Sequence, residues 1–255
     1  MFRVVIPARY ASTRLPGKAL IELAGKPMIE WVYLRSKASR ASSVIIATDD
    51  VRIAAAARAF GAPVTLTAAS HASGTDRIAE VARTQKWPPG EIVVNVQGDE
   101  PLMPPALIDQ VAALLERHES ADMATLASPL NSVAELLDPN IVKVVTTSEG
   151  RALYFSRAPI PWNRDEAASG IASQKSFDGA RRHIGIYAYR VGALLRLAVL
   201  KPTPLEQAEK LEQLRAMEHG FEIRVADSAQ PPGADVNTPE DLERAVRQIA
   251  AATPR

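Results

Sequence analysis

Short apolar stretches alternate with amphipathic helical patterns through the first half of the chain, and this alternation most constrains the fold. The expected strands are FRVVI, SVIIAT, PVTLT and EIVVNV, at 2–6, 43–48, 63–67 and 91–96. The helical patterns lie between or after them, at 27–39, 51–61, 74–85 and 105–119. Apolar strands separated by helices are typical of a parallel sheet that is covered on both faces. The sequence therefore predicts an α/β fold whose ligands bind beyond the carboxyl ends of the strands.

The second half of the chain changes pattern, because strand-like stretches follow one another with little helical signal between them. These are MATLASPL, IVKVVTT, ALYFSRAPIPW and HIGIYAYR, at 123–130, 141–147, 152–162 and 183–190. They indicate an antiparallel sub-sheet inserted at about 131–199, in a single domain over 1–255 whose core spans about 1–130 and 200–250. The remaining elements are one amphipathic helix at 203–220, a strand at 221–227 and a helix at 238–252 that Thr238 caps.

The charge and cysteine content exclude several classes of protein. Lys and Arg total 30 and Asp and Glu total 29, so the net charge of +1 provides no general attraction to nucleic acid or membranes. The absence of cysteine excludes disulfides and thiolate metal sites. Because no apolar run approaches the roughly 20 residues of a membrane helix and no secretory signal is visible, we expect a cytoplasmic protein without membrane insertion.

A basic loop follows the first expected strand. In PARYASTRLPGK, the cations Arg9, Arg14 and Lys18 surround a Pro-Gly turn. Gly17 lets the backbone approach a ligand closely, and cations with exposed backbone amides suit a phosphate group. The loop lacks the P-loop pattern. A solvated basic loop fits the spacing equally well.

Two other segments carry oxygen ligands suited to a metal ion. Asp99 follows the apolar strand EIVVNV, where a carboxylate can hold Mg²⁺ against substrate phosphates. A helix-capping role for Asp99 is an equal alternative. Asp235 and Asn237 precede the last helix and either complete a metal site or form its turn.

Small polar and aromatic groups gather in three further segments. HASGTDR offers hydroxyl and amide donors before a helix, which also describes an ordinary helix cap. In the strand at 183–190, alternation places His183, Gly185 and Tyr187 on one face, where such residues are often purely structural. Arg157 lies among polar aromatic residues and suits a carboxylated small molecule.

The helical pattern at 203–220 adds acidic and amide groups. Glu206, Glu209 and Gln213 are spaced three and four positions apart and therefore share a helix face. That face either borders the same pocket or is solvated.

Taken in order, eight segments resemble the 3-deoxy-manno-octulosonate cytidylyltransferases, a family of sugar nucleotidyltransferases. They are PARYASTRLPGK, ATDD, SGTDR, VVNVQGDEP, ALYFSRAPIPW, HIGIYAYR, LEQAEKLEQLR and NTPEDL. The resemblance covers nearly the whole chain, from Val4 to about Arg247. The resemblance implies a mainly parallel, Rossmann-like nucleotidyltransferase sheet flanked by helices, with an inserted antiparallel sub-sheet that pairs two subunits in a homodimer. It also implies transfer of CMP from CTP to 3-deoxy-D-manno-octulosonate, with release of pyrophosphate, for lipopolysaccharide biosynthesis. Mg²⁺ is the implied cofactor.

The resemblance also assigns roles to residues that match the family motifs. The implied catalytic residues are Arg9, Lys18 and Asp99. The implied nucleotide-binding residues are Arg9, Arg14, Lys18, Thr48, Asp49, Ser73, Gly74, Thr75, Arg77 and Gln97. The implied sugar-binding residues are Arg157, His183, Tyr187, Glu209 and Gln213. The implied metal ligands are Asp99 with Asn237 or Asp235.

One position departs from the family pattern. The family segment reads Val-Asp-Thr-Pro-Glu-Asp, whereas this chain has VNTPED, so Asn237 stands where a second metal-binding carboxylate is expected. A neutral carbonyl oxygen can bind Mg²⁺, but with less attraction than a carboxylate. Asp235 is the alternative ligand, through a shifted turn or a water molecule. The sequence leaves the number of metal ions open.

Other functions are compatible with parts of the sequence. A sialic acid cytidylyltransferase, or an enzyme with a different nucleotide donor, would use the same chemistry. A nucleotide-binding regulatory module without turnover is favoured by Asn237 alone. A glycosyltransferase on a similar fold would need an Asp-x-Asp pattern after a central strand, which QGDEP lacks.

Overall fold

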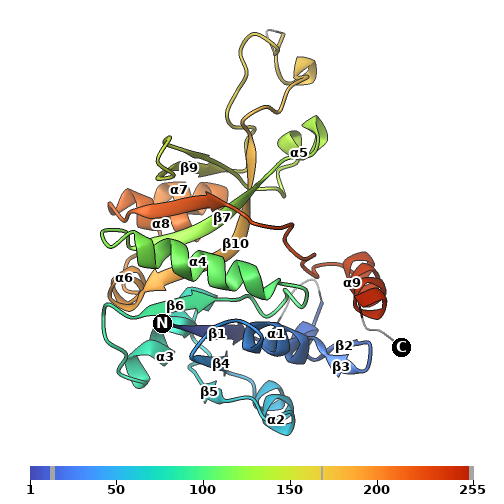
Figure 1. Cartoon of the computed structure of the whole chain (residues 1–255), viewed down its shortest axis with the longest axis vertical. Coiled ribbons are helices and arrows are strands. Elements are labelled where there is room, and N and C mark those ends of the chain that lie inside the picture. Colours follow the sequence, from blue (N-terminus) through green and yellow to red (C-terminus); the bar gives the residue numbers. More distant parts are fainter. Residues whose placement is uncertain (12–14, 168, 253–255) are drawn as a thin grey trace.

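The computed structural model describes residues 1–11, 15–167 and 169–252, and within them the strands form one mixed sheet and one small hairpin. The main sheet has the order β11-β7-β10-β6-β1-β4-β5, and β8 pairs with β10 while β9 pairs with β8 (Figure 1). Its strands are β1 (Phe2–Ala8), β4 (Ser43–Thr48), β5 (Val64–Leu66), β6 (Ile92–Asn95), β7 (Met123–Pro129), β8 (Lys143–Thr146), β9 (Ala152–Ser156), β10 (Arg181–Arg190) and β11 (Ile223–Asp227). The hairpin pairs β2 (Glu22–Leu23) with β3 (Lys26–Pro27).

Parallel pairing dominates the part of the sheet that the first half of the chain forms. β1 pairs in parallel with β4 and β6, and β4 pairs in parallel with β5. β10 enters antiparallel between β6 and β7, and β11 lies parallel to β7. The carboxyl ends of β1, β4 and β6 therefore open at one edge, where sheets of this kind bind ligands. The predicted α/β fold with a mainly parallel sheet is confirmed.

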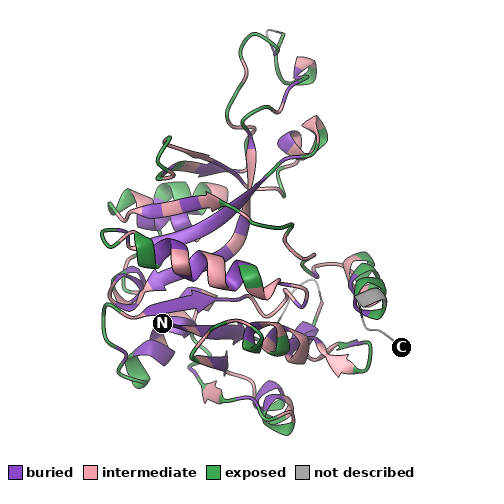
Figure 2. Ribbon diagram, in the orientation of Figure 1, coloured by how far each residue is buried: buried purple, intermediate pink, exposed green. Residues whose placement is uncertain are grey.

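Helices cover both faces of this sheet, so its central strands are buried on both sides (Figure 2). One face carries α1 (Met28–Lys37), α2 (Val51–Ala59) and α4 (Pro105–Arg117), and the other carries α3 (Gly74–Thr84), α6 (Val191–Leu197) and α8 (Glu212–Glu218). Along β1, Val4 and Ile6 join the first core and Val5 joins the second. Burial on both faces explains why the strand reads as an uninterrupted apolar run. None of the helices in the described ranges has the length and apolar character needed to cross a membrane.

The region outside the central sheet is smaller than the sequence predicts. β10 was expected within the insert at 131–199, but it pairs with β6 through Tyr187 and Asn95 and belongs to the central sheet. Among the described strands of the main sheet, β8 and β9 are the two that lie outside the continuous strand order. β8 pairs with the start of β10. A strand pattern reveals which face a residue takes but not which strand becomes its neighbour. The division into a single domain stays a prediction.

Residues 203–220 form two helices, so the prediction of one continuous helix is wrong. α7 (Pro204–Glu209) ends before Lys210, whose backbone is left-handed at φ 56° and ψ 46°, and α8 begins at Glu212. The left-handed residue interrupts the helix and turns the chain. The guanidinium of Arg215 in α8 donates to both carboxylate oxygens of Glu206 in α7, at 2.8 and 2.6 Å. LEQAEKLEQLR contains neither glycine nor proline, so its pattern gave no signal of this break.

The last helix, α9 (Pro239–Ala252), packs away from the two main cores, at the side of the molecule (Figure 1). It begins at Pro239 as predicted, and Thr238 Oγ1 accepts a hydrogen bond from the Asp241 N–H at 3.2 Å. A small apolar cluster docks it against the hairpin and the start of α1. The buried members of that cluster are Leu23, Met28, Val236, Ala245 and Ile249.

The segment between β9 and β10 runs away from the sheet and includes the single turn η2 (Ile171–Ser173) (Figure 1). Large apolar side chains are exposed along it, with Trp162 at 42% and Ile171 at 56% of their full accessibility. The short helix α5 (Val133–Leu137) lies beside its base (Figure 1).

Candidate active site

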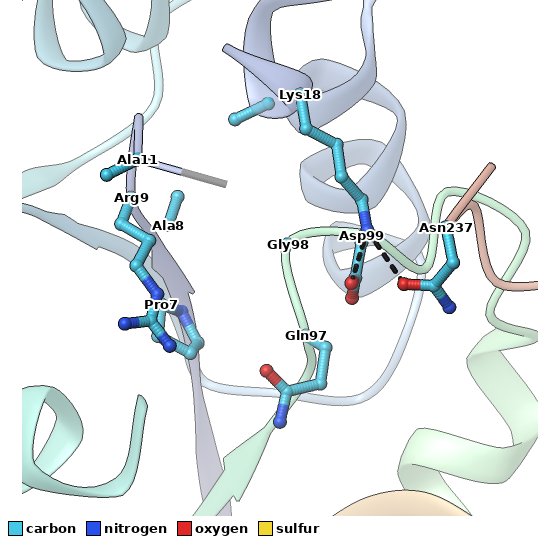
Figure 3. Close-up of a pocket in the computed structure, with 10 residues that line it drawn as sticks. Pro7, Ala8, Arg9, Ala11, Lys18, Gln97, Gly98, Asp99 and Asn237 are labelled. Carbon is cyan, nitrogen blue, oxygen red and sulfur yellow. Dashed lines mark hydrogen bonds and ion pairs between the residues drawn. The ribbon is translucent and has the colours of Figure 1, made fainter. Parts of the chain in front are cut away.

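Lys18 lines a cavity of about 350 Å³ beyond the carboxyl end of β1 (Figure 3). Gly17, at φ 69°, closes the preceding loop by donating its N–H to the Tyr10 carbonyl at 3.0 Å. This left-handed backbone favours glycine, and a Cβ there would lie 3.1 Å from the Tyr10 ring. The turn starts η1 (Lys18–Leu20) and directs the Lys18 side chain inward, where it is 11% exposed.

The ammonium of Lys18 contacts two oxygens from distant parts of the chain (Figure 3). Its Nζ donates to Asp99 Oδ2 at 2.7 Å and to Asn237 Oδ1 at 3.1 Å. Asp99 follows β6, and Asn237 lies just before α9. A carboxylate and an amide oxygen therefore converge on one cation.

Close backbone approaches hold these two oxygens in place. A Cβ at Gly98 would lie 2.9 Å from the Pro7 carbonyl oxygen, and a Cβ at Gly233 would collide with the carbonyl oxygen of Leu102. The Val236 N–H donates to the Asp99 carbonyl at 3.0 Å. The loop before α9 is thereby fixed to the loop after β6, which is why residues so far apart in sequence share one site.

A smaller cavity of about 60 Å³ adjoins the first. Five of the predicted nucleotide-binding residues line it, namely Arg9, Ser73, Gly74, Arg77 and Gln97. Arg77 is 3% exposed, with Nη2 3.2 Å from Asp49 Oδ1 and Nη1 donating to Thr67 Oγ1. Burial lowers the pKa of the Arg77 guanidinium, whereas the Asp49 carboxylate acts to raise it.

The segments ATDD and HASGTDR both lead into helices, and for HASGTDR the capping alternative holds. Asp50 caps α2, and its hydrogen bonds with Arg52 lower the pKa of Asp50 to about 2. Thr48 Oγ1 accepts from the Asp50 N–H at 3.1 Å. Ser73 and Asp76 form a capping box at the start of α3, and Ser73 lines the small cavity as well. Ser73 can therefore cap α3 and face a ligand in the small cavity at the same time.

A third cavity, of about 230 Å³, shares Gln97 with the other two. The predicted sugar-binding residues His183, Tyr187 and Gln213 line it, together with Gly185 of the same strand. Thr75, predicted to bind the nucleotide, also lines this third cavity and donates to Glu212 Oε2 at 2.8 Å.

Buried polar atoms without a hydrogen bond face the third cavity. Within the described residues, Asn95 Oδ1, Tyr187 Oη and Gln213 Nε2 are buried and have no partner. Leaving such groups unsatisfied is costly, so a ligand that completes them gains affinity. An acceptor, a hydroxyl and a donor together suit a ligand with several hydroxyl groups.

Burial also sets the protonation of this cavity. It lowers the pKa of His183 to about 3, and His183 Nε2 lies 2.9 Å from Thr125 Oγ1. It raises the pKa of Tyr187 well above its usual value and also raises that of the Glu212 carboxyl. His183 and Tyr187 therefore act as neutral hydrogen-bonding groups near pH 7, not as charges.

Arg157 and Glu209 contact each other and do not line the third cavity. Arg157 Nε donates to the Glu209 carbonyl at 2.7 Å, and the Arg157 N–H donates to Glu209 Oε2 at 2.9 Å. Arg157 Nη1 donates to the Pro139 carbonyl at 2.9 Å, and Ser156 Oγ donates to Glu209 Oε1 at 2.6 Å. These bonds join β9 to the end of α7, and contact of this pair with a sugar acid stays a prediction.

Of the remaining predicted residues, Arg9 lines the first cavity and Asp235 does not. Arg9 is exposed, lines the cavity, and donates from Nη1 to the Ala72 carbonyl at 3.4 Å. Asp235 accepts a hydrogen bond from Asn237 Nδ2 at 2.5 Å. Burial raises the pKa of Glu100, which also faces the charges of Asp99 and Asp235. Arg14 lies outside the described residues.

The oxygens around Lys18 fit a Mg²⁺ ion that arrives with its substrate. No group of three or more His, Cys, Asp or Glu side chains in the described ranges is arranged to hold a metal. Mg²⁺, however, is commonly held by one or two protein oxygens together with substrate phosphates and water. Asp99 and Asn237 already direct two oxygens at one cation, the Lys18 ammonium.

The residues of the third cavity that were not predicted from the sequence include Asn95, Tyr189 and Glu212. Asn95 is 2% exposed in β6, and a polar residue inside an apolar strand was the available signal for it. Glu212 gave no such signal, because its position depends on the unpredicted break between α7 and α8.

Comparison with known proteins adds independent information. The sequence model of the Cytidylyltransferase family matches residues 3–223. A 3-deoxy-manno-octulosonate cytidylyltransferase from Thioalkalivibrio sulfidiphilus is 53% identical over 98% of this chain and 99% of its own length. Another, from Pseudomonas syringae pv. tomato, is 56% identical over 98% of both chains.

Solved structures agree with these relatives. A CMP:2-keto-3-deoxy-manno-octonic acid synthetase complexed with CTP has a TM-score of 0.88 and 39% identity, covering 98% of this chain and 99% of its own. A cytidylyltransferase from Leptospira borgpetersenii has a TM-score of 0.65 at 18% identity, covering 99% of this chain and 88% of its own, which supports the fold alone.

Proposed function

Because the chain belongs to the cytidylyltransferase family, we propose that it transfers CMP from CTP to 3-deoxy-D-manno-octulosonate and releases pyrophosphate. The relatives named above, each covered over nearly its whole length, support this substrate pair. The product, a CMP-activated sugar acid, would supply lipopolysaccharide biosynthesis.

The observation that carries the proposal is the meeting of the three cavities at Gln97. One side offers the cations Arg9, Arg77 and Lys18, which suit a nucleoside triphosphate. The other side offers the hydrogen-bonding groups of His183 and Tyr187 and their neighbours, which suit sugar hydroxyls. The reacting phosphate and hydroxyl would therefore meet beside Gln97.

The reaction joins two anions, so charge neutralisation and positioning are the main contributions of the protein. The anomeric hydroxyl oxygen bonds to the α-phosphorus in line with the departing group. The bond from the α-phosphorus to the bridging oxygen breaks, pyrophosphate leaves with the electron pair, and the hydroxyl proton passes to water. Lys18 and Arg9 would offset the phosphate charge as it shifts toward pyrophosphate.

We propose Mg²⁺ as the cofactor, held by Asp99 and Asn237 together with phosphate oxygens. When bound, it supplies positive charge to the phosphates and lowers the pKa of a coordinated hydroxyl. The convergence of Asp99 Oδ2 and Asn237 Oδ1 on the Lys18 ammonium supports this assignment. Lys18 would then turn from these two oxygens toward the phosphates when the nucleotide enters.

The proposed location is the cytoplasm, which contains the CTP that the reaction consumes. Immunoblotting of cytoplasmic and membrane fractions tests it: recovery of the protein mainly with membranes would contradict the proposal.

We also propose a homodimer that pairs through the segment between β9 and β10. The exposed Trp162 and Ile171 on that segment, and Leu153 on β9, support this interface. Light scattering should give twice the chain mass of 27.5 kDa, and Trp162→Asp with Ile171→Asp should halve it. A monomeric wild-type protein would contradict the proposal.

Pyrophosphate release from CTP tests the function directly. Paired reactions with and without 3-deoxy-D-manno-octulosonate, each across a Mg²⁺ series, should show release that needs both the acid and the metal. Release with sialic acid in its place would reassign the acceptor. No release with either acid at saturating CTP and Mg²⁺ would overturn the proposed enzyme activity.

A further inference from the structure

Asn237 contacts a donor on one side of its amide and an acceptor on the other (Figure 3 shows the Lys18 side). Its Oδ1 accepts from Lys18 Nζ at 3.1 Å, and its Nδ2 donates to Asp235 Oδ2 at 2.5 Å. An ammonium only donates and a carboxylate only accepts, so a single orientation of the amide satisfies both neighbours. The chemistry of the two neighbours therefore fixes which end of the amide faces Asp99.

An asparagine at a cation site differs from an aspartate in this respect. Both oxygens of a carboxylate can bind a metal, whereas a half-turn of an amide replaces the ligand oxygen by an NH₂ group, which repels a cation. We infer that Asp235 is a positioning residue, which holds the Asn237 amide with its oxygen directed at the cation site and so lets a neutral residue bind the metal. This inference rests on the metal role of Asn237 in the proposed function.

The loop that carries these residues is held by contacts that do not involve the Asp235 side chain. The Val236 N–H donates to the Asp99 carbonyl at 3.0 Å, and the Asn237 N–H donates to Asp241 Oδ2 at 3.0 Å. Gly233 packs against the Leu102 carbonyl. Asp235 itself is exposed. Shortening its side chain should therefore remove the acceptor that holds the Asn237 NH₂ group and leave the backbone in place.

Four variants separate orientation from charge and from general loop structure. Asp235→Ala removes the acceptor. Asp235→Asn keeps an acceptor oxygen and removes the charge. Asn237→Asp makes the ligand symmetric, and Asp235→Ala combined with Asn237→Asp completes a double-mutant cycle. Circular dichroism and thermal unfolding of each variant monitor the fold.

The readout is Mn²⁺ binding in the presence of CTP, followed by the electron paramagnetic resonance signal of unbound Mn²⁺. Asp235→Ala should weaken Mn²⁺ binding about 10-fold, the lower end of the effect of losing a partner that orients a metal ligand. Asp235→Asn should stay within about 3-fold of wild type, because its carbonyl oxygen still accepts from the amide. In the Asn237→Asp background, Asp235→Ala should change binding less than about 3-fold, because a carboxylate needs no orientation.

Each contrary result overturns the inference. Wild-type affinity in Asp235→Ala would mean that the amide needs no partner. Equal losses in Asp235→Asn and Asp235→Ala would show an effect of charge, and an equal loss in the Asn237→Asp background would show a general effect on the loop. Absence of Mn²⁺ binding by wild type would remove the premise. Because pyrophosphate release by wild type is measured separately, failure of this cycle is distinguishable from failure of the proposed function.

Discussion

Asp99 lies in the candidate active site, paired with the Lys18 ammonium, and its side chain is 35% exposed. Replacing it by asparagine removes the charge that pairs with Lys18 and attracts a metal, without opening a cavity in the core. We expect Asp99→Asn to lower kcat for pyrophosphate release at least about 100-fold. The midpoint of thermal unfolding should stay within about 3 °C of wild type. Glu119→Gln, an exposed carboxylate in the turn after α4, is the matched control. Wild-type kcat in Asp99→Asn would exclude the carboxylate from the reaction.

His183 makes the free energy of unfolding depend on pH below about 6.5. Burial lowers its pKa in the folded protein to about 3, below the ordinary 6.5. Between these values the unfolded chain binds a proton that the folded chain does not, so stability falls as pH decreases from 6.5 toward 3. The contribution lost at pH 5, compared with pH 7.5, is on the order of 2 kcal/mol.

His183→Gln should remove this part of the acid sensitivity, because glutamine does not titrate and can still bond to Thr125. Urea unfolding at pH 7.5 and pH 5 measures the change in unfolding free energy for both proteins. An equal loss of stability in both would show that His183 titrates normally when folded.

At the scale of elements, Lys210 is the residue that separates α7 from α8. It holds a left-handed backbone at φ 56°, which costs a residue with a Cβ on the order of 1 kcal/mol. We expect Lys210→Gly to raise the unfolding free energy by about 0.5–1 kcal/mol, as measured by urea denaturation. Lys210→Ala removes the same charged side chain and keeps the strain, so it should not gain this stability. Equal stability of the two variants would contradict the strain argument.

The sequence predicted most elements and failed where tertiary contacts decide. The strands at β1, β4 and β6 were predictable because each is a continuous apolar run, and their shared edge followed from parallel pairing. The α7–α8 break was not predictable, since the chemistry of Lys210 gives no reason for a left-handed residue. The pairing of β10 with β6 was missed because periodicity does not encode strand neighbours.

The site shows the same division. Lys18 and Asp99 were singled out because each follows a strand that ends at the ligand-binding edge, and they lie 2.7 Å apart. Asp235 was singled out as a metal ligand, and its hydrogen bond to Asn237 was not foreseen. Arg157 was chosen for its charge, but its guanidinium donates to two backbone carbonyls. The partner of a side chain depends on distances that sequence spacing does not contain.

At the scale of the whole molecule, α9 is a separable part that completes the site. Its buried residues form a cluster distinct from the two cores of the sheet. Ala245 is fully buried in that cluster, so Ala245→Asp buries an unpaired charge and should release the helix. We expect kcat to fall at least about 10-fold, as for the loss of a ligand-positioning contact, while the far-ultraviolet circular dichroism of the sheet persists.

Gln248→Asp places the same charge on an exposed position of α9 and is the matched control. It should keep wild-type turnover. Full turnover in Ala245→Asp would show that α9 is not needed to hold Asn237.

The bond between Lys18 and Asn237 joins positions 219 residues apart. On a translating ribosome, the strands that precede Lys18 and Asp99 emerge and pair long before Asn237 is made. A nascent chain therefore assembles most of its sheet while one of the two oxygens around the cation is still missing. If translation stops before α9, the released fragment holds the basic loop and lacks that oxygen. Turnover that depends on Asn237 can then begin only after that residue has been made, long after the first strands of the sheet have paired.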